Sequence, residues 1–250
     1  MRAPPPTNGP RFAAKPLDGG GTPVREWLGA RRPPLLDLTG CSSLIVIGAH
    51  PDDETLGLGA TIAQLAAAGI AVRVVSVSDG GAAHPAASVS ERVRLEGTRR
   101  DELLNAAAIL GVDAPLTLGL PDGRLAEHED HLTGLLGEIL QDCAPASWCA
   151  ATWRGDGHPD HEAVGRAAAT ACERAGRTLL EYPVWMWHWA VPGDPDVPWD
   201  RAFSVPVEQW AVERKSKAAQ CFPSQFDGPD PVLPPFTLQR LLAVGEVVFQ

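Results

Sequence analysis

Residues 43–55 read SLIVIGAHPDDET, an apolar run that ends directly in a histidine and three carboxylates. The run Ser43–Ile47 is short and rich in β-branched residues, which is typical of a strand buried on both faces. Apolar residues with helical spacing follow it, so the polar residues form the loop between a strand and a helix. Because each polar group costs free energy when buried without a partner, this loop requires either contact with solvent or a chemical role.

The alternation of strand and helix continues along the chain. Apolar or β-branched runs predict further strands at 70–77, 115–118, 147–151 and 178–184. Helical spacing predicts helices at about 58–69, 89–110, 129–142 and 161–175. A helix at 207–220 and a strand at 245–249 close the domain. We therefore expect one α/β domain, a Rossmann-like three-layer α/β/α fold with a mostly parallel, twisted sheet.

Two segments fall outside this alternation. Residues 1–40 begin with a stretch rich in proline and glycine, which predicts an N-terminal arm that is loose or lies on the surface of the main domain, residues 41–250. Residues 181–205 are rich in tryptophan and proline, which predicts an insert or lid made of a long loop or a short β excursion.

The composition excludes several classes of partner. The 250 residues have 44% hydrophobic and 21% charged side chains, as in ordinary globular proteins, with a net charge of −10 and a pI of about 5.1. An acidic chain is a poor match for nucleic acid or for anionic lipid. The N-terminus lacks the apolar region of a signal peptide, and no apolar run is long enough to span a membrane. The five cysteines include no C-x-x-C pair, so we expect a reduced, cytoplasmic protein without a cysteine zinc site.

A helix cap is the simplest explanation of the first polar loop. Pro51 suits the first turn of a helix, and the carboxylates Asp52 and Asp53 suit its positive end. Capping leaves His50 unexplained. A second loop, RGDGHPDHE at 154–162, also follows a predicted strand and precedes a predicted helix. Loops at the carboxyl ends of parallel strands meet at one edge of the sheet, where ligands bind.

Together the two loops predict a metal site. His50 and Asp53 from the first loop and His161 from the second give two imidazoles and one carboxylate. Three protein ligands with one position left for water is the pattern of catalytic zinc, and Asp52 is free to act as a base on that water. His158 would then be a general acid or an oxyanion stabiliser, with Asp160 able to orient it. The same ligand types also suit the Fe(II) of non-haem oxygenases, although the extra carboxylate favours hydrolysis.

At this point the chain resembles a known family. AHPDDE at 49–54 followed by HPDH at 158–161 is similar to the paired signature of the PIG-L/LmbE-like zinc de-N-acetylases. The resemblance covers most of residues 43–185 and extends weakly to about 226. It implies that His50, Asp53 and His161 bind one Zn²⁺, that Asp52 is the general base, and that His158 is the oxyanion stabiliser and acid. By the same resemblance, Arg99 and Asp122 would contact sugar hydroxyls. Phe222 stands where the family usually has a histidine.

Further candidates for substrate contact come from the residues alone. Asp79 ends a predicted strand and could touch substrate, although forming a turn also explains it. Trp185, Trp187 and Trp189 would share one face of an extended segment and either wall a sugar-binding groove or pack in the core. His188 would project into the site from the opposite face.

These observations predict a zinc-dependent hydrolase that removes an N-acetyl group from an N-acetylglucosamine-type sugar or its conjugate, in the biosynthesis of a thiol or another specialised metabolite. The alternatives are an amidase of amino-sugar thiol conjugates, a non-catalytic metal-binding module and the Fe(II) oxygenase. A dinucleotide site is disfavoured because G-x-G-x-x-G is absent, and Gly57 more plausibly lets its helix approach the sheet. No G-x-S-x-G supports a serine hydrolase.

Overall fold

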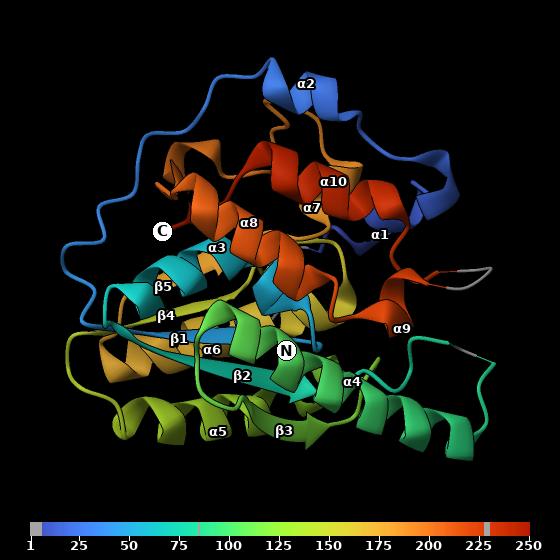
Figure 1. Ribbon diagram of the computed structural model, residues 1–250, viewed down its shortest axis with the longest axis horizontal. Coiled ribbons are helices and arrows are strands. Elements are labelled where there is room, and N and C mark those ends of the chain that lie inside the picture. Colours follow the sequence, from blue (N-terminus) through green and yellow to red (C-terminus); the bar gives the residue numbers. More distant parts are fainter. Residues whose placement is uncertain (1–6, 85, 228–230) are drawn as a thin grey trace, which may run out of the picture.

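The computed structural model describes residues 7–84, 86–227 and 231–250. Within these residues the centre is a seven-stranded sheet of order β3-β2-β1-β4-β5-β7-β6 (Figure 1). The first five strands in the chain run parallel, whereas β7 is antiparallel to β5 and to β6. The strands are β1 (Ser43–Gly48), β2 (Ala71–Ser78), β3 (Leu116–Leu120), β4 (Ser147–Thr152), β5 (Leu179–Tyr182), β6 (Ala202–Ser204) and β7 (Val247–Phe249). The predicted α/β domain with a mostly parallel sheet is confirmed.

Helices cover both faces of the sheet (Figure 1). The longer helices are α3 (Asp53–Ala67), α4 (Val89–Leu110), α5 (Glu129–Gln141), α6 (Pro159–Ala175), α8 (Gln209–Ala219) and α10 (Pro235–Val244). α5 and α6 pack on one face of the sheet, and α3, α4 and α8 pack on the other. No helix in the described ranges combines the length and apolar character that crossing a membrane requires.

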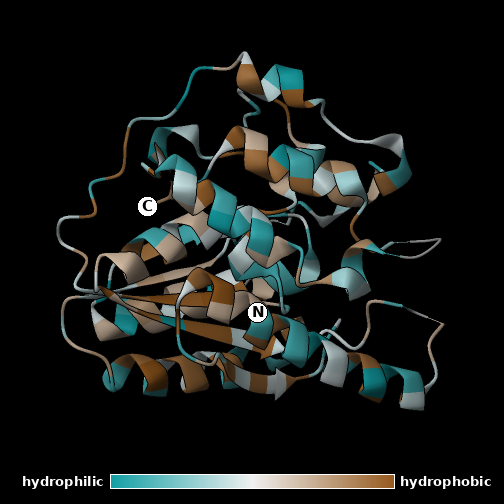
Figure 2. Cartoon of the chain, viewed as in Figure 1, coloured by the Kyte–Doolittle hydropathy of each residue, from teal (hydrophilic) through white to brown (hydrophobic). Residues whose placement is uncertain are grey.

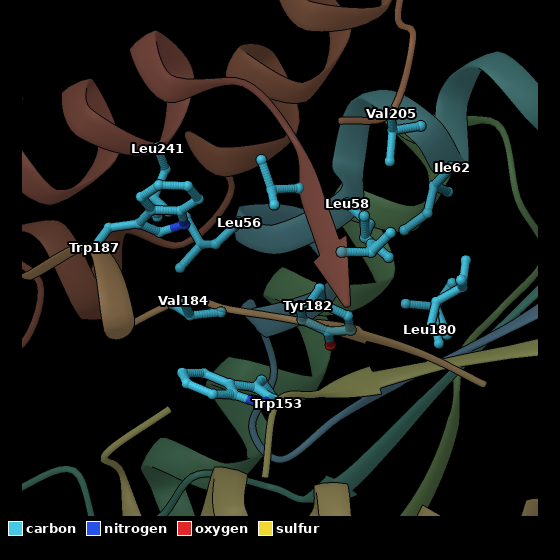
Figure 3. Packing of buried hydrophobic residues seen from close by; sticks show 14 of the residues in the cluster. Leu56, Leu58, Ile62, Trp153, Leu180, Tyr182, Val184, Trp187, Val205 and Leu241 are labelled. Carbon is cyan, nitrogen blue, oxygen red and sulfur yellow. The ribbon is translucent and has the colours of Figure 1, made fainter. Parts of the chain in front are cut away.

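Each face of the sheet has its own apolar core. Figure 2 shows hydrophobic strands between helices whose surfaces alternate in hydropathy. Figure 3 shows the larger core, in which Leu58 and Ile62 of α3 lie over β5 and its Tyr182. A Cβ added to Gly57 would lie 2.2 Å from the Tyr182 ring, so glycine is what allows α3 to come this close to the sheet.

Residues 181–205 differ from the prediction. The tryptophans lie in and beside a short helix, α7 (Met186–Trp189), so the predicted extended segment with one aromatic face is wrong. The 3₁₀ turn η3 (Trp199–Arg201) and strand β6 follow, and both come before β7 in the chain. The reason for the helix lies in a distant carboxylate, described below.

The described part of the predicted arm, residues 7–40, packs against the domain. It forms α1 (Gly9–Ala13), the 3₁₀ turn η1 (Leu17–Gly19) and α2 (Val24–Leu28). Trp27 and Leu36 are buried, and Leu35 pairs with Ser204 of β6 in a parallel bridge. Residues 1–6 lie outside the described residues. Two short elements complete the chain, η2 (Leu125–His128) and α9 (Pro223–Phe226).

Candidate metal centre and active site

The two polar loops meet at the carboxyl edge of the sheet. β1 lies between β2 and β4, so the chain order reverses at the β1–β4 pair. Open α/β sheets bind ligands in the crevice at such a reversal. The loop from Ala49 to Asp52 follows β1, and the loop from Trp153 to His158 follows β4. The predicted meeting of the two loops is therefore found at the place where this fold forms binding sites.

Three imidazoles and one carboxylate converge there. Ring nitrogens of His50, His158 and His161 all lie within 4.8 Å of one another, as metal ligands would. The carboxylate of Asp53 bridges two of them: Oδ1 lies 3.1 Å from His161 Nε2, and Oδ2 lies 3.5 Å from His50 Nδ1. The structure thus brings together His50, Asp53 and His161 and adds His158 to the same cluster.

The outer nitrogens of two of these rings are held by other carboxylates. His161 Nδ1 lies 2.8 Å from Asp156 Oδ2, and His50 Nε2 lies 3.1 Å from Asp122 Oδ1. Metal-binding histidines typically hold a carboxylate with the nitrogen that faces away from the ion. The inner nitrogen, His161 Nε2, is buried and lacks a hydrogen-bond partner among the described residues, although Asp53 is near. A buried, unpartnered nitrogen beside a carboxylate fits a metal ligand.

The electrostatics of the cluster also favour a cation. Burial lowers the pKa of His161, but the carboxylates of Asp53 and Asp156 outweigh it and raise this pKa to about 9. Burial raises the pKa of Asp53, but His161 and His50 bring it well below its usual range. The buried carboxylates therefore require a positive charge between them, from a proton or from a metal ion.

Asp52 lies beside the cluster in an unusual conformation. Its φ is 136° and its ψ is −27°, the only positive φ outside glycine in the described chain. Its side chain makes no capping hydrogen bond to α3, so the simple capping explanation does not hold for Asp52. Burial raises the pKa of Asp52 to about 7, although Arg99 opposes this shift. A carboxylate with a pKa near neutrality suits a general base.

Arg99 is directed toward the first loop. Its guanidinium donates to the backbone oxygen of Pro51 at 2.8 Å, to Asp52 Oδ2 at 3.2 Å and to the oxygen of Gly80 at 3.1 Å. Its side chain is almost fully buried. These contacts give Arg99 a role in holding the loop and its base, in addition to its place on the pocket wall.

His158 and Asp160 behave differently from the prediction. His158 caps α6, since its Nδ1 accepts from the backbone N–H of Asp160 at 3.3 Å. Burial, with the neighbouring imidazoles His161 and His50, lowers the pKa of His158 to about 3, so the ring is neutral and carries its proton on Nε2. The Asp160 carboxylate accepts from Gly123 N at 2.7 Å and lies 3.4 Å from His50 Nε2, and within the described structure it forms no hydrogen bond with the His158 ring. The expectation that this carboxylate orients His158 is corrected: the Asp160 backbone does so.

A cavity of about 210 Å³ opens beside these residues. Arg99 and Asp122 lie on its wall, as does Trp185. Asp122 combines this position with its contact to His50 Nε2. The remaining wall comes from Asp52, Leu56, Ala82, Ala83, Gly123, Val184, Gln225, Val232, Leu233 and the residues of the cluster.

Three predicted substrate contacts lie elsewhere. Asp79 accepts from Arg100 Nη1 at 2.6 Å and is absent from the described wall of the cavity. Trp187 packs edge to face on Trp27 of the arm, at 4.9 Å between ring centroids. His188 is buried with its Nε2 2.9 Å from the backbone oxygen of Lys15. The helical turn of α7 aims Trp185 at the cavity and directs its neighbours into the arm.

Two residues that contact the site escaped the sequence analysis. Asp156 is fully buried and, besides His161, accepts hydrogen bonds from the backbone N–H groups of Val184, Trp185 and Met186. In the sequence, its position before Gly157 suggests a turn residue. The only signal of a role in the site is that His158 and His161 follow within five residues. Phe12 of α1 lies 5.0 Å from Trp185 and 6.5 Å from His158 between ring centroids, with no sequence signal that places it there.

The family comparison agrees with this geometry. The sequence model of the PIG-L family, described as GlcNAc-PI de-N-acetylase, matches residues 45–172, just over half of the chain. The chain belongs to this family. The matched stretch contains both loops of the cluster, His50 to Asp53 and Asp156 to His161.

Individual PIG-L relatives and similar structures extend the comparison. The 1D-myo-inositol 2-acetamido-2-deoxy-alpha-D-glucopyranoside deacetylase of Mycobacterium sp. (strain KMS) is 36% identical over 173 residues, which cover 59% of this chain and 54% of that protein. The chain thus spans about half the length of that relative. N,N'-diacetylchitobiose deacetylase from Pyrococcus horikoshii has a TM-score of 0.55 at 22% identity and covers 77% of this chain and 75% of its own.

A similar fold is also found in an enzyme that catalyses a different reaction. A 4-carboxy-2-hydroxymuconate hydratase from Pseudomonas putida has a TM-score of 0.57 at 18% identity, covering 81% of this chain and 84% of that chain. At such identities the likeness establishes the fold alone. The choice between activities therefore rests on the residues of the site.

Proposed function

We propose that this PIG-L protein is a cytoplasmic, zinc-dependent hydrolase that removes the N-acetyl group from an N-acetylglucosamine-type conjugate, in the biosynthesis of a thiol or another specialised metabolite. The observation that carries the proposal is the buried Nε2 of His161, which makes no hydrogen bond among the described residues and lies 3.1 Å from Asp53 Oδ1, with Asp52 on the wall of the same cavity. His50, Asp53 and His161 would hold the ion. Zinc bound there would supply Lewis acidity, which makes water a nucleophile near neutral pH and polarises an amide carbonyl.

The protein's own residues would handle the protons. Asp52, with its pKa near 7, would take a proton from the attacking water and return it to the amine when the carbon–nitrogen bond breaks. His158, neutral and protonated on Nε2, would donate to the oxygen of the acetyl group as that oxygen gains charge. Acetate and a free amine would be the products. Arg99 would hold Asp52 in position.

The cavity and the relatives support the choice of substrate. A volume of about 210 Å³ suits one sugar-sized group with its acetamide, and the wall offers both carboxylates and the Trp185 ring. The curated Mycobacterium relative is named for an acetamido sugar. We propose zinc and not Fe(II) because of Asp52. A carboxylate base beside the metal ligands is useful for hydrolysis.

Metal analysis combined with amine release tests the proposal. The protein purified with zinc should bind about one ion per chain and release acetate from a panel of N-acetylated amino sugars, glycosides and conjugates. Asp52→Asn should keep the metal and lose most turnover, whereas Asp130→Asn, which changes an exposed carboxylate on α5, should alter neither. Wild-type turnover by Asp52→Asn would show that the base is assigned wrongly.

The same panel separates the alternatives. An amidase of thiol conjugates would cleave larger acyl groups and leave the acetamides intact. A binding module would take up metal without releasing any amine. An Fe(II) oxygenase would require oxygen, so activity of the zinc form under anaerobic conditions would exclude it.

A further inference from the structure

A second and larger cavity, of about 650 Å³, lies between the arm and the C-terminal part of the chain. We call it the arm pocket. It shares no lining residue with the catalytic cavity, and all its described lining lies outside the stretch that matches the PIG-L family. Its size is in the range of small-molecule sites. The lining residues are Trp27, Leu28, Ala30, Arg31, Arg32, Pro33, Pro34, Trp187, Pro192, Gly193, Trp199, Asp200, Ser204, Val244 and Val247.

The inner wall of the arm pocket is aromatic, and two of its three indole N–H groups already have acceptors. The Trp27 ring meets Trp187 at 4.9 Å and 84°, and Trp199 at 6.1 Å and 47°. Trp27 Nε1 donates to the Trp187 backbone oxygen, and Trp199 Nε1 donates to the Asp194 oxygen. Because these two indole N–H groups are already used, Trp27 and Trp199 offer a ligand mainly the apolar surfaces of their rings.

The rim of the arm pocket is cationic. Arg31 and Arg32 are both exposed, and within the described ranges neither forms an ion pair or a hydrogen bond. Asp200 is the single carboxylate on the described lining, and it pairs with neither arginine. Two guanidinium groups at the mouth of an apolar cavity match a ligand with one acidic group.

The pocket is also attached to the catalytic site. Trp185 lines the catalytic cavity and Trp187, two residues later, lines the arm pocket. Asp156 connects them to the metal cluster, because it binds both His161 and the backbone N–H of Trp185. The two cavities therefore lie on either side of the same short segment, residues 185–187.

We propose that the arm pocket is a second binding site, for an amphipathic organic anion whose apolar body lies against the tryptophans and whose carboxylate or sulfonate meets Arg31 and Arg32. This inference does not depend on the proposed deacetylase activity. A flat aromatic or an acyl body would fit, since the wall provides mainly shape and apolar area.

A matched pair of fluorescent probes tests the two parts of this proposal. Anilinonaphthalene sulfonate carries both an aromatic body and an anion, and N-phenylnaphthylamine is the same body without the sulfonate. The full chain should bind one equivalent of the sulfonate at least about tenfold more tightly than the neutral probe. Arg31→Glu combined with Arg32→Glu should weaken sulfonate binding about tenfold and leave the neutral probe unchanged. An equal change of charge, Arg73→Glu with Arg94→Glu at exposed sites outside the pocket, should have no effect.

Further measurements locate the bound probe. Ala30→Trp, which puts a large ring on the half-buried lining of the pocket, should weaken both probes, and removal of metal by a chelator should weaken neither. Equal affinity for the two probes, or full sulfonate binding by the double Arg variant, would overturn the proposal. So would light scattering that finds a dimer which the double Arg variant dissociates, since a second copy of the chain would then be the occupant.

Discussion

The two loops of the metal cluster perform the same task with different backbones. Each follows a parallel strand, presents His-Pro-Asp and starts a helix. In the second loop the unusual backbone angle falls on Gly157, with a φ of 93°, which glycine adopts at little cost. In the first loop it falls on Asp52, with a φ of 136°. Strain of this kind costs about 1–3 kcal/mol per residue and is concentrated at functional sites.

This difference shows that the site places its backbone strain on the residue that we propose as the general base. A glycine at position 52 would relieve the first loop, as Gly157 does in the second, but would remove the carboxylate that we propose as the general base. Glu54 and Arg99 hold the strained residue from two sides, since Asp52 N donates to Glu54 and Arg99 donates to Asp52 Oδ2. We infer that the aspartate is kept for its side chain at the expense of stability.

The strongest way to break the comparison is to replace Asp52. Both Asp52→Gly and Asp52→Ala should lower kcat by about 10²–10⁴, the usual contribution of a general base. Both remove the same carboxylate, so they differ only in backbone freedom. Asp52→Gly should be the more stable by about 1 kcal/mol, because glycine accepts the positive φ and alanine does not. Acetate release and urea unfolding measure the two effects. An alanine variant as stable as the glycine variant would show that the loop is not strained.

A second variant tests the carboxylate of Asp156, which holds His161 of the second loop from the side away from the proposed ion. Asp156→Asn keeps an oxygen for the backbone N–H groups of Val184 and Met186, but it loses the charged oxygen that pairs with His161 Nδ1 and accepts from Trp185 N. Zinc affinity should fall about 10- to 100-fold, as is usual for such outer contacts. Competition with a fluorescent chelator measures it. Asp194→Asn, which changes a buried aspartate paired with Arg11 away from the cluster, is the control and should keep the metal. An unchanged zinc affinity in Asp156→Asn would mean that His161 binds the metal equally well without a carboxylate at its Nδ1.

The glycine of the second loop can be removed in turn. Gly157→Ala forces a side chain into a positive φ and places Cβ 2.8 Å from Trp189 Nε1 and 2.9 Å from Phe12 Cβ. We expect a loss of about 2 kcal/mol in the free energy of unfolding, from conformation and contact together. Gly176→Ala, with a φ of 62° and nothing within 4 Å, carries the conformational cost alone and should lose about 1 kcal/mol. If the two variants lose equal free energy of unfolding, then the contacts of the new Cβ at position 157 add no cost, and Phe12 must move aside easily.

The smallest expected effect concerns Phe12 itself. Phe12→Ala removes the ring beside Trp185 and His158, a contact worth about 0.5–1.5 kcal/mol. The KM for substrates large enough to reach the arm should rise a few-fold with kcat nearly unchanged, whereas N-acetylglucosamine should be unaffected. Steady-state kinetics on the two substrates decides it, with Phe12→Leu as the control for bulk. A fall in kcat on both substrates would mean that Phe12 acts through His158.

The sequence predicts those parts of the site that are local. Strand, loop and helix at 43–55 are specified by neighbouring residues, and the two His-Pro-Asp loops are recognisable because each follows a strand. Asp156 binds residues 184–186, and Phe12 meets Trp185, across separations that no local pattern reveals. Such contacts depend on the folded chain as a whole.

The tryptophan segment shows why a local pattern can mislead. Alternating tryptophans predict an extended strand, since successive side chains of a strand point to opposite faces. The carboxylate of Asp156 instead binds three consecutive backbone N–H groups at the start of α7, which satisfies the free donors of a helix start and fixes the turn. The distant carboxylate outweighs the local preference, and Trp187 and His188 turn toward the arm.

The bridge between Leu35 and Ser204 has a consequence for how the protein can be handled. Strand β6 is the last strand of the sheet, and its free side faces the arm, where Leu36 N donates to Ser204 O and Ser204 N donates to Pro34 O. An uncovered strand at the end of a sheet is a template for pairing with other chains. The arm therefore shields the protein against self-association, and a chain shortened to begin at residue 41 should aggregate on concentration even if its metal site forms.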